Sequence, residues 1–228
     1  MDVIIFDNIT FTAGEKEFLD VLKLHPDSGM IEEAGRFFRE AREFVRPKAV
    51  YMNTKVERAG SGFVVIGGVQ FDSQVLRKNI EQSRAVFPFI ATCGREIADW
   101  AASVGGMLES YWADTVMTMA LETAANALYG HLLRLAGEAQ LSRMNPGSLA
   151  AWPIEQQKPL MELLGEGATV IGVSLTEQYL LRPFKSVSGI QFVGEEYFVN
   201  CLLCTREDCP NRERSYNESL WGKYGGRD

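Results

Sequence analysis

The feature that most constrains the fold is the long, largely apolar stretch between residues 97 and 136. Within it, residues 108–136 predict one long helix. Small side chains recur along this helix at Ala113, Ala120, Ala124, Ala125, Ala127 and Gly130. Because small side chains let backbones approach closely, we expect the helix to pack centrally on a sheet. Ionisable residues such as Asp99, Glu109, Asp114, Glu122 and His131 interrupt the stretch, which argues against a membrane span.

Other elements come in mixed order around this helix. Runs rich in β-branched and aromatic residues predict strands at residues 3–6, 49–52, 62–66, 85–90, 169–175, 186–192 and 197–200. Helical periodicity predicts further helices at residues 30–45, 74–83, 96–104 and 153–164. The regular strand–helix alternation of a parallel sheet is missing, so the sequence predicts an α+β fold on a largely antiparallel sheet.

Composition and charge narrow the classes of partner. The 228-residue chain carries a formal net charge of -7, and it has no run rich in Lys and Arg, so we expect no nucleic-acid partner. The first residues lack the basic and apolar regions of a secretory leader. We therefore expect no membrane association and a cytoplasmic location, in which cysteines stay reduced.

A candidate binding site lies at residues 143–148, which read Arg-Met-Asn-Pro-Gly-Ser. An Arg placed shortly before a Pro-Gly turn brings a guanidinium next to exposed backbone groups, and this arrangement suits a small ligand with a carboxylate. Taken alone, the hexapeptide favours a surface Arg beside an ordinary turn.

Further motifs follow this turn in a fixed order: Glu-Leu-Leu at 162–164, Leu-Thr-Glu at 175–177 and Ser-Val-Ser-Gly at 186–189. Together with Arg143, Pro146 and Gly147, these motifs resemble the activation domain of cobalamin-dependent methionine synthase. That family carries an Arg-x-x-Pro-Gly-Tyr turn, a helix ending in Glu-Leu-Leu, then Leu-Thr-Glu-Ser and a Ser-Val-Ser-Gly strand. The resemblance covers residues 143–200.

The resemblance implies a fold and a role. Members of the family form a C-shaped single α+β domain with a twisted, mainly antiparallel sheet. They bind S-adenosylmethionine and cover a corrinoid while its Co(II) is reduced and remethylated. The resemblance thus implies an accessory protein for reductive reactivation of a corrinoid methyltransferase, with cobalamin on the partner.

By matching position, the resemblance implies that Arg143 holds the ligand carboxylate, with Asn145, Pro146, Gly147 and Ser148 forming the surrounding turn. The family has Tyr where this chain has Ser148, so a large aromatic contact is missing there. An acidic residue on the preceding helix of the family corresponds to Glu122, for which an exposed helix residue is the alternative interpretation.

Three of the four cysteines, Cys201, Cys204 and Cys209, fall within nine residues, and Cys93 is the fourth. Thiolates at two-residue spacing can converge on one ion, so the pattern predicts a metal site completed by Cys93. Four sulfur ligands suit zinc or an iron–sulfur cluster, and the need for an electron in Co(II) reduction favours the latter. A redox dithiol and buried reduced thiols are the alternatives.

The sequence predicts a domain over residues 1–200 and a cysteine-containing C-terminal segment over residues 201–228. At 228 residues there is no room for the other synthase modules, so we expect a free-standing protein acting on a separate corrinoid-binding protein or methyltransferase. An electron donor would be a second partner. The alternative function is a non-catalytic interaction or sensor module that binds S-adenosylmethionine or a metal.

Overall fold

The computed structural model of the chain describes residues 2–25, 28–138 and 140–224. A five-stranded sheet forms its centre, in the order β1 (Val3–Phe6), β2 (Lys48–Met52), β6 (Val86–Thr92), β10 (Ser186–Phe192) and β7 (Ser142–Met144). Every neighbouring pair is antiparallel. The predicted α+β single domain on an antiparallel sheet is therefore confirmed.

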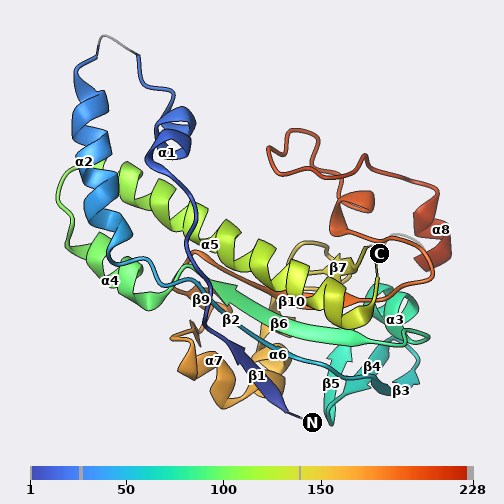
Figure 1. Cartoon of the computed structure of the whole chain (residues 1–228). Coiled ribbons are helices and arrows are strands. Elements are labelled where there is room, and N and C mark those ends of the chain that lie inside the picture. Colours follow the sequence, from blue (N-terminus) through green and yellow to red (C-terminus); the bar gives the residue numbers. More distant parts are fainter. Residues whose placement is uncertain (1, 26–27, 139, 225–228) are drawn as a thin grey trace.

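One face of the sheet is covered by α5 (Met107–Ala136), as predicted from its small residues. Ala124 and Leu128 of α5 are fully buried and belong to one cluster with Phe87 and Phe89 of β6. The helices α1 (Glu15–Leu22), α2 (Met30–Arg42) and α4 (Arg95–Ser103) pack around the N-terminal half of α5. Figure 1 shows them as an arm at one end of α5, with the C-terminal segment near the other end.

The opposite face carries a second layer. It contains the three-stranded sheet of β3 (Val56–Gly60), β4 (Phe63–Ile66) and β5 (Val69–Asp72), with α3 (Gln74–Ile80), α6 (Gln157–Leu164) and α7 (Glu166–Val170). A 3-10 turn, Ile154–Gln156, leads into α6, and β8 (Ser174–Leu175) pairs with β9 (Leu181–Arg182). The chain closes with a 3-10 turn at Asn200–Leu202 and with α8 (Leu220–Tyr224). The largest buried cluster lies between this layer and the central sheet.

Two predicted strands are wrong. Residues 169–175 form the end of α7 and the short β8, because Ala168 and Ile171 turn into the main core and Gly172, with φ of 79°, reverses the chain. The β-branched residues of this segment favoured a strand, but tertiary packing overrides that preference. Residues 197–200 also form no strand: Val199 makes one isolated bridge to Arg143 before the chain enters the 3-10 turn.

The C-terminal segment packs on the domain. Leu203 and Tyr224 both belong to the main core cluster. The last four residues of the predicted segment, 225–228, lie outside the described residues. Among the described helices, none has the length and apolar character needed to cross a membrane.

Candidate functional site

Arg143 lies at the edge of the central sheet. On β7 it stands directly opposite Gln191 of β10, so the two side chains share the sheet face that α5 covers. Its backbone N–H donates to the carbonyl oxygen of Phe198 at 2.8 Å, which fixes the strand on its outer side. The guanidinium is about one-third exposed and forms an ion pair with the carboxylate of Glu213. Arg143 therefore presents its charge at a surface with a rigid backbone behind it.

The turn after Arg143 has the conformation that its residues favour. Ser148 N–H donates to the Asn145 carbonyl oxygen at 3.2 Å, and Gly147 has φ of 80°. Pro followed by a residue with positive φ is typical of a type II turn, in which Gly is preferred at the second central position. Gly147 N–H also donates to the Trp152 carbonyl oxygen at 2.8 Å. The predicted turn is confirmed, and hydrogen bonds to Asn145 within it and to Trp152 outside it hold its conformation.

Asn145 connects this turn to two neighbouring segments. Its Nδ2 donates to the backbone oxygen of Ser188 at 2.7 Å, and its Oδ1 accepts from Nδ2 of Asn200 at 2.8 Å. The backbone at Met144, just before the turn, can lie this close to β10 only because residue 189 is glycine: a Cβ there would lie 2.3 Å from the Met144 carbonyl oxygen. The glycine of the Ser-Val-Ser-Gly motif thus lets the turn pack closely on β10.

Two cavities meet at Arg143. The first, which we call the turn cavity, has a volume of about 670 Å³ and is bordered by the turn residues 145–148 and by residues 186–188. The second, the helix cavity, has a volume of about 600 Å³ and lies between α5 and the sheet edge. The residues that line both are Arg143, Asn145, Val187, Val199, Asn211 and Glu213.

The structure brings the predicted binding residues to these two cavities. Pro146, Gly147 and Ser148 line the turn cavity beside Arg143 and Asn145. Glu122 is exposed on α5 and lines the helix cavity, which Arg143 and Asn145 also border. The geometry therefore unites residues that the sequence separates by about twenty positions. Their contact with a ligand stays a prediction.

Polar residues that the sequence analysis missed also border the helix cavity. Gln191 is only 2% exposed, and among the described residues its Oε1 has no hydrogen-bond partner. The sequence signal that could have identified Gln191 is a polar amide side chain within an otherwise apolar part of a predicted strand. Tyr129 and Tyr197 line the same cavity, and burial, followed by the charge of Glu213, raises the pKa of Tyr197. No sequence pattern marked the two tyrosines.

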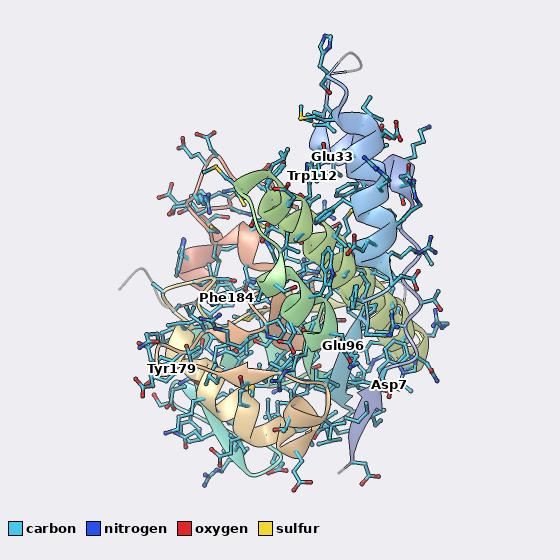
Figure 2. All side chains as sticks on the ribbon, turned by 90° about the vertical axis from the view of Figure 1, so that its left-hand side faces the viewer. Asp7, Glu33, Glu96, Trp112, Tyr179 and Phe184 are labelled. Atoms are coloured by element: carbon cyan, nitrogen blue, oxygen red, sulfur yellow. The ribbon has the colours of Figure 1, made fainter. Side chains whose placement is uncertain are left out.

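Two aromatic side chains extend the turn cavity. Tyr179 and Phe184 both line it, and Figure 2 shows them toward the same edge of the molecule. Phe184 is 59% exposed, and the Arg182 guanidinium lies 3.6 Å from the centre of its ring. Tyr179 is half-buried, and the face of the Phe184 ring that Arg182 leaves uncovered can stack on a planar or cationic group of a ligand. The sequence analysis did not identify this pair.

The cysteines divide into two groups. Cys201, Cys204 and Cys209 line the turn cavity. Cys93 is fully buried in the cluster formed by the helical arm, and burial raises the pKa of its thiol to about 12. Across residues 2–25, 28–138 and 140–224, no group of three or more His, Cys, Asp or Glu side chains is arranged to hold a metal ion. The structure thus places Cys93 with the core, and a site at the other three thiols stays a prediction.

Comparison with known proteins finds similarity in three-dimensional structure and none in sequence families or curated sequences. A scan against models of protein families finds no match, and a search of curated proteins finds none either. Among solved structures, the chain is similar to the MetH reactivation domain bound to AdoHcy, with a TM-score of 0.61 and 18% identity. The similarity covers 88% of this chain and 82% of that chain. At this identity the likeness concerns the fold, and the chain has the fold of that reactivation domain.

Proposed function

We propose that the chain binds S-adenosylmethionine across the turn and helix cavities and serves as an accessory protein in the reductive reactivation of a corrinoid enzyme. The observation that carries this proposal is the meeting of Arg143, Asn145 and Glu122 around two neighbouring cavities that share lining residues, in a fold shared with a domain solved with AdoHcy. AdoHcy is what remains of S-adenosylmethionine after its methyl group has been transferred.

The chemistry of the cavities supports this ligand. Each cavity falls within the size range of small-molecule sites, about 300–1,000 Å³. The Arg143 guanidinium suits the ligand's carboxylate through paired, charge-assisted hydrogen bonds. Glu122 supplies negative charge near the ligand's ammonium and sulfonium groups. The buried Oε1 of Gln191 offers an acceptor to an N–H or O–H of the ligand.

Other aromatic residues of the turn cavity could replace the aromatic contact that Ser148 does not provide. Tyr179 and Phe184 line the turn cavity, and neither of them borders the helix cavity. Their uncovered ring surface offers a ligand an aromatic contact that the serine cannot supply. The substitution at position 148 therefore leaves the cavity with aromatic surface for a ligand.

The reaction itself belongs to the partner's cobalt. The partner's corrinoid would supply the methyl-accepting chemistry: with one electron from a donor it would accept the methyl group of the sulfonium, and S-adenosylhomocysteine would remain. In this account the chain binds the methyl donor, orients it and presents it to a corrinoid-binding protein or methyltransferase. The chain's own residues carry no covalent step.

Calorimetric titration with S-adenosylmethionine tests the binding half of the proposal. Wild-type protein should bind, and Arg143→Ala should bind roughly 10- to 150-fold more weakly, because a charge-assisted hydrogen bond contributes about 1.5–3 kcal/mol. Arg77→Ala is the matched control, since Arg77 also forms an ion pair but does not border either cavity. Equal affinity in all three proteins would contradict the site.

The reactivation half needs a corrinoid assay. A cobalamin-dependent methyltransferase in its Co(II) state, mixed with the chain, S-adenosylmethionine and a one-electron donor, should gain the absorbance of methylcobalamin. The gain should depend on the chain and be lost with Arg143→Ala. Binding of S-adenosylmethionine without any change in the corrinoid spectrum would favour the non-catalytic sensor module instead.

A further inference from the structure

The C-terminal segment forms a closed surface loop over residues 202–217. Asn217 N–H donates to the Leu202 carbonyl oxygen at 2.8 Å, which brings the two ends of the loop together. Inside it, the Arg212 guanidinium donates to the backbone carbonyl oxygens of Cys201, Cys204, Arg206 and Arg214. A compact loop with adjoining ends is an Ω-loop, a type that is frequently functional.

The loop is anchored near its start by Leu203 and beyond its end by Tyr224. Leu203 and Tyr224 are buried in the main core, and the Tyr224 hydroxyl donates to Oδ1 of Asn79 at 3.0 Å. Between these anchors, none of residues 204–219 is buried. Segments with few buried apolar contacts open at low free-energy cost. The Arg212 hydrogen bonds hold the loop together as one unit, so the exposed Glu213 side chain can leave Arg143 while the ends of the loop stay in place.

The middle of this loop borders both cavities. Asn211 and Glu213 border both cavities, and the Glu213 carboxylate pairs with the Arg143 guanidinium. Figure 1 shows the segment, coloured orange to red, on the β7 side of α5. Among the described residues that border both cavities, Arg143 is the only cation, and the Glu213 carboxylate pairs with it.

We propose that the loop over residues 202–217 is a self-inhibitory strap whose Glu213 carboxylate competes with the ligand carboxylate for Arg143. This inference rests on the proposed binding of S-adenosylmethionine and adds a regulatory element to that site. Two carboxylates on one guanidinium that is only about one-third exposed repel each other, so the incoming carboxylate displaces Glu213. Whatever draws the strap away, such as a docked partner, then raises the affinity for the methyl donor.

Titration of Glu213→Ala with S-adenosylmethionine tests the strap. Exposed ion pairs contribute modestly, so the variant should bind about two- to fivefold more tightly than the wild-type protein. Glu207→Ala is the matched control, because Glu207 belongs to the same loop and is exposed but borders neither cavity. Its affinity should equal that of the wild-type protein.

A second ligand separates competition from general loosening. 5′-Methylthioadenosine keeps the nucleoside and sulfur of S-adenosylmethionine but has no carboxylate, so its affinity should be the same in wild-type and Glu213→Ala protein. If both ligands bind more tightly to the variant, the strap does not compete for Arg143 and the inference is overturned.

The remaining outcomes distinguish the strap from the function on which it rests. Equal or weaker binding of S-adenosylmethionine by Glu213→Ala, with clear binding by the wild-type protein, would reject the strap and leave the proposed function standing. No binding by either protein would reject the proposed function, and the strap with it.

Discussion

The side-chain amide of Asn145 donates a hydrogen bond to the backbone oxygen of Ser188 at 2.7 Å. This contact joins the turn that follows Arg143 to the Ser-Val-Ser-Gly strand, so two motifs more than forty residues apart form one rigid wall. Because Asn200 donates to the same amide group, the wall also includes the start of the C-terminal segment. Arg143 is positioned by this three-way connection.

Asn145→Ala should destabilise the fold and weaken ligand binding. The substitution leaves the Ser188 oxygen and the Asn200 amide without their partner, at a cost on the order of 1–3 kcal/mol in the free energy of unfolding. Urea denaturation measures this change. Asn8→Ala, at an exposed position, should stay within about 0.5 kcal/mol of the wild-type protein. Equal stability of the two variants would mean that the Asn145 contacts contribute nothing.

Gln191→Leu should separate ligand binding from stability. The Oε1 of Gln191 is buried without a partner among the described residues, so an apolar side chain of similar size should leave the free energy of unfolding unchanged or raise it. If a ligand donates to that oxygen, affinity for S-adenosylmethionine should fall by about 2- to 13-fold. Denaturation and calorimetry on the same sample give both values. A less stable variant with unchanged affinity would refute this role.

Cys93 should make the stability of the protein fall at high pH. Burial raises the pKa of its thiol to about 12 from the ordinary 9.0. Below pH 9 the thiol is protonated in both folded and unfolded states, so its contribution is fully present. Between pH 9 and 12 only the unfolded chain loses the proton, so stability falls by up to about 1.4 kcal/mol per pH unit.

Comparison with Cys93→Ala isolates that contribution, because every other ionisable group is common to the two proteins. The variant should lose stability less steeply between pH 9 and 11, as measured by urea denaturation. Identical slopes would show that Cys93 ionises normally in the folded protein. Thiol labelling of metal-free protein at pH 8 gives an independent check: Cys201, Cys204 and Cys209 should react in the native protein, and Cys93 only after unfolding.

Much of the fold could be predicted because its signals are local. The long helix, the helix that begins near Met30 and the strand after Ser186 each follow from periodicity or composition over their own residues. The segment around Val170 could not be predicted in this way. Its β-branched residues favour a strand, whereas Gly167 lets a helix approach β1 so closely that a Cβ would lie 2.5 Å from Val3 Cγ1.

The site could be predicted only in part, for a related reason. Arg143 and its turn form a continuous motif, and the sequence identified them. Gln191 and Tyr197 border the helix cavity because of strand register and of a long-range bridge, neither of which a single sequence reveals. The pairing of Glu213 with Arg143 depends on how a loop without helix or strand folds back, and no local pattern encodes it.

A crystal structure of the chain with bound S-adenosylhomocysteine tests the central claim most directly. The account predicts that the ligand carboxylate pairs with the Arg143 guanidinium beside the Asn145–Ser148 turn, that the nucleoside occupies the adjoining cavities, and that the Glu213 carboxylate has moved away. A ligand bound elsewhere on the molecule, with Arg143 still paired to Glu213, would contradict the account.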